Sequence, residues 1–227
     1  MKKEGVNKCS LEECFPNVSF GNTVQVLGVK SVSIGEGACI GDDVWLNICD
    51  RDDRLRMKIG RCVLIGRQSV ISTGGYLEIG DYCILAPRVY VSDTDHVFED
   101  IHQPVIQQGA TLGRSVTVEE NCWLGINSVI TGNLTVGRGS VVGANSLVIR
   151  EVPPFSVVVG NPARIIKMYN PQTKNWELTK TEEEQKKVLA AREAFKLPTR
   201  EEYKQLLTKN ATVTCVYSIA AGRGESI

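Results

Sequence analysis

The stretch VEENCWLGINSVITGNLTVGRGSVVGANSL, residues 118–147, decides the fold because one pattern repeats in it every six residues. Each unit starts with an aliphatic residue, usually continues with glycine, and carries a small residue at its fifth position, as in LGINSV and VGANSL. The helical period of 3.6 residues is absent, so the pattern predicts short strands joined by turns. We expect the aliphatic and the small residue to point inward, and glycine to permit the turn backbone.

The same hexad extends from this stretch over about residues 14–168, and three strands are expected to close each coil of a triangular prism. Extra residues follow Val26, Leu46, Ile71 and Val91, where the steps to the next leading residue are 8, 13, 8 and 21 instead of 6. These insertions fall at every third hexad, so they should all project from one corner of the prism. The leading aliphatic residues are Ile34, Ile40, Leu46, Ile59, Ile65, Ile71, Ile79, Leu85, Val91, Leu112, Val118, Leu124, Ile130, Val136, Val142 and Val148.

The longest interruption is VSDTDHVFEDIHQPVIQQGATLG, Val91–Gly113, which predicts a protruding loop over about residues 92–111. This interruption contains the only two histidines of the chain, His96 and His102. A long loop inside an otherwise regular repeat is typical of a functional segment. We therefore expect the site of chemistry here.

The two ends of the chain differ from the repeat. Residues 1–13 form a polar lead-in, and residues 169–227 are expected to be a helical extension with a tail. Thr181 with Glu184, and Thr199 with Glu202, have the spacing of capping boxes, so each pair predicts the start of a helix. For residues 211–227 the sequence leaves open whether they form a strand. The predicted fold is all-β, with a C-terminal α-helical extension.

Composition excludes several classes of function. The chain has 227 residues with 26 acidic and 26 basic side chains, so no net field would attract nucleic acid. No apolar run is long enough to cross a membrane, and we expect a cytoplasmic protein without membrane insertion. The eight cysteines contain no C-x-x-C pair, so we expect no metal site. Cys83 and Cys122 instead occupy the small fifth position of their hexads, as buried thiols do.

Three segments carry a resemblance to a known family: HVFEDIHQPVIQQG, ENCWLGINSVI and VPPFSVVVGNPARIIK. They resemble the hexapeptide-repeat acyltransferases, in particular the galactoside and maltose acetyltransferases and related sugar O-acetyltransferases of surface-polysaccharide pathways. The resemblance implies a left-handed parallel β-helix, a homotrimer, and acetyl-CoA as the acyl donor. It also implies a sugar acceptor that is acetylated by direct transfer, without a covalent acyl-enzyme.

Within this resemblance, His96 matches the catalytic histidine. A sugar hydroxyl is protonated at neutral pH, and histidine is the usual general base for it. Asp93, Asp95 and Glu99 are candidates to orient the imidazole or to bind acceptor hydroxyls, with a solvated loop position as the alternative for each. His102 lies at a different spacing from the second histidine of the relatives, which favours a surface role.

The resemblance assigns the acyl donor to residues near the end of the repeat. Gly125 and Ala144 are small where the pantetheine arm of the cofactor would pass, and the Gly125 amide is the candidate oxyanion donor. Basic residues suit phosphate groups, and Arg150, Arg164 and Lys167 match basic positions of the family. Trp123 matches an active-site tryptophan. The hexad count places it in one outward column with Trp45, Val70, Tyr90 and Val141, with subunit packing as the alternative role.

The acceptor is less defined. Where relatives carry a contacting asparagine, the alignment has Ser72, and Asn47 lies one coil earlier in the same column. The leading alternative function is N-acetylation of an amino-sugar nucleotide, and a catalytically silent scaffold is a further one. The zinc-dependent carbonic anhydrases built on similar repeats need three histidine ligands per metal, two of them five residues apart on one chain. Only two histidines, six residues apart, are present, so that function is excluded.

Overall fold

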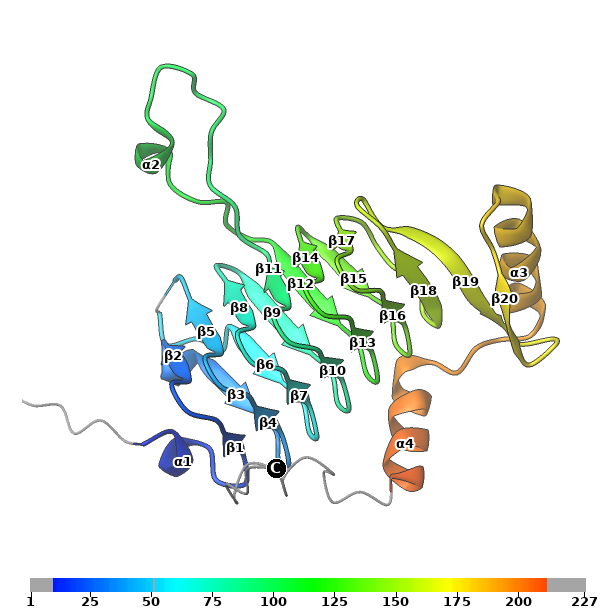
Figure 1. The fold of residues 1–227 in the computed structure, drawn as a ribbon, viewed down its shortest axis with the longest axis horizontal. Coiled ribbons are helices and arrows are strands. Elements are labelled where there is room, and N and C mark those ends of the chain that lie inside the picture. The colour runs from blue at the N-terminus through cyan, green and yellow to red at the C-terminus, as the bar shows by residue number, and fades with distance from the viewer. Residues whose placement is uncertain (1–9, 51, 212–227) are drawn as a thin grey trace, which may run out of the picture.

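A computed structural model describes residues 10–50 and 52–211, and its strands stack as three parallel sheets around one axis (Figure 1). Successive strands occupy the three sheets in turn, so three strands make one coil of a triangular prism. Sheet A contains, in spatial order, β1 (Ser19–Phe20), β4 (Cys39–Ile40), β7 (Leu64–Ile65), β10 (Ile84–Leu85), β13 (Trp123–Leu124), β16 (Val141–Val142) and β18 (Ser156–Val159). Sheet B contains β2 (Gln25–Leu27), β5 (Trp45–Ile48), β8 (Val70–Thr73), β11 (Tyr90–Ser92), β14 (Val129–Thr131) and β17 (Leu147–Val148). Sheet C contains β3 (Val32–Ile34), β6 (Met57–Ile59), β9 (Tyr76–Ile79), β12 (Ser115–Val118) and β15 (Leu134–Val136).

The leading aliphatic residues form the core, as the hexad predicts. Ile40, Leu46, Ile65, Leu85 and most of their equivalents are fully buried along the axis. The small fifth residues are buried too, including the Cys83 and Cys122 thiols, and burial raises the pKa of Cys122 well above its usual value. Each coil thus adds another layer to one continuous apolar core.

The hexad glycine has a different role from the predicted one. The left-handed turn conformation belongs to the fourth residue of the hexad, such as Asp43 with φ 57° or Asn127 with φ 58°. At Gly66 a Cβ atom would lie 2.5 Å from the nitrogen of Pro87, and at Gly125 it would lie 2.6 Å from the nitrogen of Ala144. Glycine is therefore required because the backbone of the next coil passes too close for any side chain.

The predicted register after the long loop is wrong. Leu112 is 71% exposed and belongs to no strand, since β11 ends at Ser92 and β12 begins at Ser115. The loop therefore comprises residues 93–114, with one short helix, α2 (Val105–Gln108), and it projects away from the coils (Figure 1). Every later hexad consequently lies one sheet away from its predicted place. The insertions up to this loop do share one corner, the connection from sheet B to sheet C.

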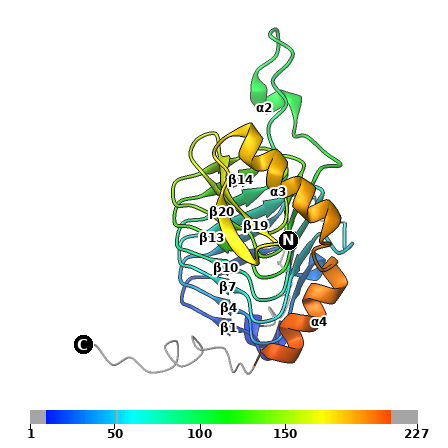
Figure 2. The same ribbon diagram turned by 90° about the vertical axis from the view of Figure 1, so that its right-hand side faces the viewer.

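The C-terminal extension starts as strand, not helix. β18 pairs antiparallel with β19 (Arg164–Asn170), which pairs in turn with β20 (Asn175–Leu178). The two predicted helices follow as α3 (Glu182–Ala194) and α4 (Arg200–Asn210), and both capping boxes are confirmed. α3 packs on β19, whereas α4 runs along one side of the coils (Figure 2). At the other end lie α1 (Leu11–Cys14) and the short 3₁₀ helix η1 (Val29–Ser31), and the predicted tail from 212 falls outside the described residues.

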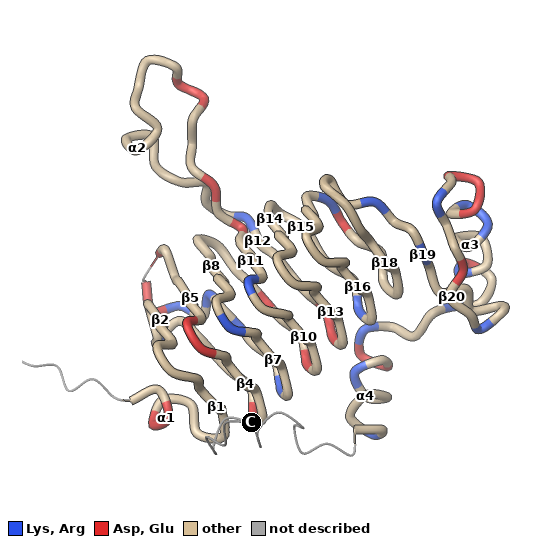
Figure 3. Tube along the Cα trace, in the orientation of Figure 1, with Lys and Arg blue, Asp and Glu red and all other residues tan. Residues whose placement is uncertain are grey.

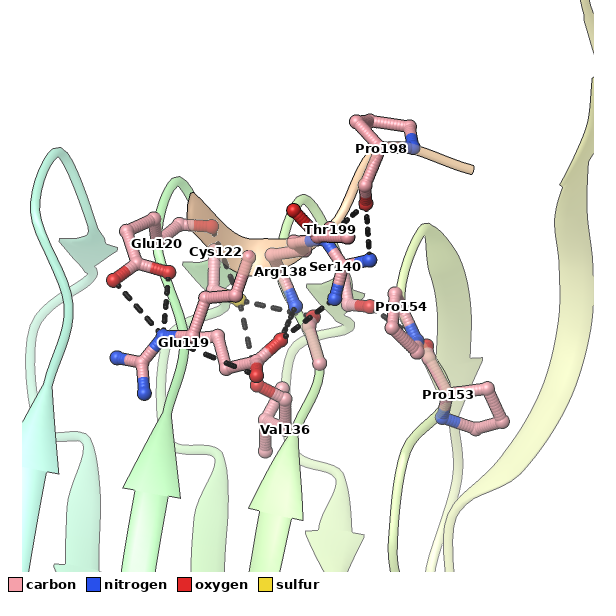
Figure 4. Close-up of polar contacts among 12 residues, drawn as sticks. Glu119, Glu120, Cys122, Val136, Arg138, Ser140, Pro153, Pro154, Pro198 and Thr199 are labelled. Atoms are coloured by element: carbon pink, nitrogen blue, oxygen red, sulfur yellow. Dashed lines mark hydrogen bonds and ion pairs between the residues drawn. The ribbon is translucent and has the colours of Figure 1, made fainter. Parts of the chain in front are cut away.

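Charged residues hold α4 on the turns that join sheet C to sheet A (Figure 3). Arg200 contacts the buried Glu120 carboxylate at 2.9 Å and Glu78 at 2.9 Å, while Lys204 lies 3.5 Å from Asp81. Burial alone would lower the pKa of Arg200, but the hydrogen bonds and charges of Glu120 and Glu78 outweigh burial and raise it. The segment before α4 is held by Arg138, whose Nε donates to the Pro198 carbonyl at 3.0 Å (Figure 4).

We expect Arg200→Ala to release α4, because it leaves the Glu120 carboxylate buried without a counter-charge. An uncompensated buried charge of this kind costs about 3 kcal/mol. Amide hydrogen exchange should rise across residues 200–210, and the melting temperature should fall. Glu201→Ala, one residue further on the exposed side, is the control, and equal protection of α4 in both variants would contradict the assigned contact.

Candidate active site

A cavity of about 360 Å³ lies between sheet B and the base of the long loop. The sheet contributes residues from β5, β8 and β11, and the loop contributes the residues that leave and re-enter the coil. The cavity is lined by Trp45, Cys49, Val70, Ser72, Tyr90, Ser92, Thr94, Asp95, His96 and Ala110. His96, Ser72 and Asp95, which the sequence singled out separately, therefore meet in one place.

The base of the loop is a two-stranded ribbon that fixes the position of His96. His96 forms an antiparallel bridge with Ala110. On either side of this bridge, the Thr111 amide donates to the Asp95 carbonyl at 2.8 Å, and the Val97 amide donates to Gly109 at 3.1 Å. The His96 side chain remains exposed at the mouth of the cavity. A base placed at such a mouth can reach a bound hydroxyl.

Ser72 and Cys49 form a polar part of the cavity lining, and Asn47, which is not in the lining, contacts both of them. Asn47 on β5 pairs in register with Ser72 on β8, and its Nδ2 donates to Ser72 Oγ at 3.0 Å. Cys49 Sγ lies 3.4 Å from the same Nδ2 and 3.6 Å from Ser72 Oγ. Ser72 and Asn47, the two alternatives for an acceptor contact, are thus adjacent and form one polar group with Cys49. Cys49 was not predicted, although its spacing of two from Asn47 puts both on the outward face of an extended strand.

The apolar wall of the cavity is the outward column of sheet B. Trp45, Val70 and Tyr90 are register partners on β5, β8 and β11, which confirms this part of the predicted column. Trp123 and Val141 are not members, because the register shift at the loop places them on β13 and β16 of sheet A, where Trp123 lies between Ile84 and Val141. Trp123 is 53% exposed there and does not line the cavity.

Asp93 anchors the loop instead of facing the acceptor. Its carboxylate is 1% exposed and accepts hydrogen bonds from the amides of Gly74, Gly75 and Tyr76 at 2.8–3.0 Å. The hydroxyls of Thr73 and Thr94 donate to it as well, both at 2.7 Å. The prediction of a substrate contact is wrong, because a carboxylate with five donors has no oxygen left for imidazole or sugar. Asp93 thus ties the start of the loop, three residues before His96, to the preceding coil.

The other two carboxylates have separate positions. Asp95 lines the cavity, and its Oδ2 lies 3.0 Å from Arg114 Nη1 across the base of the loop. Glu99 lies further out, where its Oε2 accepts from the Phe98 amide at 3.0 Å, and it is not part of the lining. A role in orienting His96 or binding the acceptor remains a prediction for both residues.

A second cavity, of about 500 Å³, opens at the C-terminal end of the coils. It contains two predicted cofactor residues, Arg150 and Arg164, whereas Lys167 lies outside the lining. A third cation in the lining is Lys180, which precedes α3. The full set is Val148, Ile149, Arg150, Glu151, Val152, Val158, Ala163, Arg164, Ile165, Lys180, Glu182 and Gln185.

The two predicted small positions lie between these cavities along the chain of coils. Ala144 is exposed, while Gly125 is buried and lies against the coil of Ala144. The Gly125 amide donates to the Val142 carbonyl at 2.8 Å. Its assignment as the oxyanion donor is therefore wrong, because the hydrogen-bond ladder between coils already uses this N–H group.

Within residues 10–50 and 52–211, no group of three or more His, Cys, Asp or Glu side chains could hold a metal ion. No described helix is long and apolar enough to cross a membrane.

Comparison with known proteins identifies the family. A family model described as bacterial transferase hexapeptide (six repeats) matches residues 115–150. A probable acetyltransferase of Mycobacterium tuberculosis is 32% identical over 54% of this chain and 42% of its own length. The galactoside O-acetyltransferase of Escherichia coli is 29% identical over 63% of this chain and 67% of its own length. A putative lipopolysaccharide biosynthesis O-acetyl transferase of Escherichia coli is 30% identical over 71% of this chain and 76% of its own length.

The chain belongs to the hexapeptide-repeat acyltransferase family. A solved structure of this fold is a mutant of AntD, an N-acyltransferase from Bacillus cereus, in complex with dTDP and coenzyme A. It superposes with a TM-score of 0.57 at 23% identity, covering 67% of this chain and 82% of that chain. The predicted fold class, a left-handed parallel β-helix with helices at its C-terminal end, is confirmed.

Membership of this family allows the first cavity to be tested through its thiol. We expect N-ethylmaleimide to abolish acyl transfer, because alkylation of the exposed Cys49 would fill the space beside Ser72. Cys49→Ser should remain active and lose this sensitivity, while the buried Cys83 and Cys122 thiols should not react. Turnover would be measured after removal of excess reagent, with the labelled cysteine mapped by mass spectrometry. Unchanged turnover with fully alkylated Cys49 would show that this cavity takes no part in the reaction.

Proposed function

We propose that this protein is an acetyl-CoA-dependent O-acetyltransferase that acts on a sugar hydroxyl of a surface polysaccharide or its precursor. The observation that carries the proposal is that His96 and Ser72 line one cavity, where Ser72 Oγ accepts a hydrogen bond from the neighbouring Asn47. A proton acceptor and a group of hydrogen-bonding side chains are what the acylation of a hydroxyl requires.

In the proposed reaction, His96 acts as the general base. The imidazole takes the proton of the acceptor hydroxyl while its oxygen forms the ester bond to the acetyl carbon. The carbon–sulfur bond of the thioester breaks, and the departing thiolate takes the proton back from the imidazolium. No covalent acyl-enzyme is needed, because donor and acceptor are bound together and the proton passes through one side chain.

The two cavities suit the two ends of the donor. The first lies on sheet B at the base of the long loop, and the second lies at the C-terminal end of the coils, where residues 149–151 leave β17. β11 borders the first cavity and β17 the second, and these two strands are separated by β14 alone, so they lie on the order of 10 Å apart. An extended pantetheine arm running between the two cavities would place the thioester near His96. Arg150 and Arg164 would then contact the phosphates.

The acceptor cavity favours a sugar. The Trp45 and Tyr90 side chains offer apolar surface to a sugar ring, and Ser72 and Asp95 offer hydrogen bonds to its hydroxyls. Two relatives are named as O-acetyltransferases, of galactosides and in lipopolysaccharide biosynthesis, which supports the same class here. The Cys49, Cys83 and Cys122 thiols form no disulfide, which suits a reducing compartment such as the cytoplasm.

We further propose a homotrimer in which exposed apolar surface of one subunit is covered by the next. Ile84 and Trp123 project from sheet A with 44% and 53% exposure. The long loop carries Phe98, Ile101 and Ile106 at 67–88% exposure. Large exposed apolar side chains gathered on two surfaces are typical of an interface.

Replacement of His96 tests the chemistry. We expect His96→Ala to lower turnover by roughly 100- to 10,000-fold, the range for loss of a positioned general base, with little change in acetyl-CoA affinity. His102→Ala is the matched control, because His102 is exposed in the same loop and does not line the cavity. Rates would be measured by thiol release with a panel of sugars and amino-sugar nucleotides. Near-normal turnover of His96→Ala would contradict the proposed base, and transfer to an amine alone would favour N-acetylation.

Replacement of Trp123 tests the assembly. We expect Trp123→Arg to shift the protein from trimer to monomer, since a charge would be buried at the proposed interface. Leu206→Arg, a change of similar exposure on α4, is the control. Mass would be measured by light scattering after gel filtration. A monomeric wild-type protein, or a Trp123→Arg trimer as stable as the wild type, would contradict the proposed interface.

A further inference from the structure

The C-terminal extension forms part of the second cavity. Arg150 enters its lining from the turn after β17, and Arg164 enters from β19. Lys180, Glu182 and Gln185 come from the start of α3 and the residue before its N-cap. The cavity is therefore bounded on one side by the repeat and on the other by a segment that the repeat does not contain.

The backbone at Lys180 is fixed by its neighbours. Thr179 is fully buried, and its amide donates to the Ile166 carbonyl at 3.0 Å. Its carbonyl accepts from Gln185 Nε2 at 2.9 Å, and Gln185 itself lines the cavity. Lys180 thus leaves a fixed point on the wall, while its own side chain is exposed and can extend into the cavity.

The charges in and around the cavity leave the cations available. Glu151 lines the cavity but accepts from the Thr135 amide at 2.9 Å, and Arg164 donates to the Ala163 carbonyl at 3.0 Å. Glu182 lies in the lining as well. Glu184 is engaged in the capping box, where its hydrogen bonds with Thr181, and to a smaller extent Lys180, lower its pKa. Three cations face two carboxylates in the lining, so an anionic group can be bound with a net positive charge around it.

We propose that Lys180 completes the phosphate-binding part of the acyl-donor site, together with Arg150 and Arg164. This inference rests on the proposed function, and it makes the C-terminal extension a part of the donor site. The nucleotide end of coenzyme A carries a diphosphate and a separate phosphomonoester. Cations from three elements can contact these groups from different sides, whereas Lys167 lies outside the cavity lining. Loss of α3 would therefore remove a binding residue as well as a packing element.

The test is calorimetric titration of the full chain with coenzyme A, dephospho-coenzyme A and pantetheine. We expect Lys180→Ala to weaken binding of coenzyme A roughly tenfold, the effect of one charge-assisted contact at an exposed site. The loss should shrink at high salt. Binding of pantetheine, which lacks the nucleotide, should be unchanged. In turnover assays the KM for acetyl-CoA should rise while kcat stays constant.

Lys186→Ala is the matched control, because Lys186 is an exposed lysine on α3 outside the cavity lining. The capping box of α3 starts at Thr181, so replacement of Lys180 leaves it intact. If Arg164→Ala weakens binding and Lys180→Ala does not, the role of Lys180 is wrong and the proposed function stands. An equal loss for pantetheine would make the effect of Lys180 structural and overturn the inference. If the wild-type chain binds no coenzyme A, both proposals fall.

Discussion

The close approach of successive coils is the constraint on which the rest of the structure depends. Each coil donates its backbone hydrogen bonds to the next, as from Gly66 to Leu85 at 2.7 Å and from Gly125 to Val142 at 2.8 Å. At the second position of most hexads stands a glycine that faces the backbone of the following coil, and at Gly66 and Gly125 a Cβ atom would overlap that backbone. Glycine at that position is thus a packing requirement between coils, and the left-handed turn falls to the fourth residue instead.

The close packing of the coils also limits where the chain can carry an insertion, and with it a functional loop. The turns from sheet C to sheet A and from sheet A to sheet B are short and tightly stacked, so they cannot vary in length without breaking the ladder. The corner from sheet B to sheet C accepts insertions, and the base of the longest one lines the first cavity. The buried Asp93 shows how such an insertion is made rigid, because three amides and two hydroxyls of the coil edge and loop converge on one carboxylate. A loop anchored in this way can hold His96 in a fixed position although its outer part is exposed.

The sequence alone predicted the architecture but not its register. The segment LGRSVT, from Leu112, fits the hexad as well as the true units do, and only the pairing of Val116 with Leu77 shows which residues enter the sheet. Because of this register error, the hexad count places Trp123 on the outward face of sheet B, whereas it lies on sheet A. Motif and repeat mark His96 and Ser72, which line one cavity, whereas Cys49 in the same lining has no motif of its own. Lys180 could not be found either, since its position depends on how β19 and β20 fold back on the last coil.

The C-terminal extension contacts the prism at two places that differ in chemistry. α4 contacts the turns between sheets C and A through ion pairs to buried carboxylates, an arrangement in which the loss of one partner is costly. The start of α3 lies at the cavity end, where Arg150, Arg164 and Lys180 have no buried carboxylate partner among the described residues. The α4 cations that pair with carboxylates hold the extension in place. Arg150, Arg164 and Lys180, which have no such partner among the described residues, remain able to bind a phosphate. The same segment can therefore stabilise the fold at one corner and contribute to ligand binding at another.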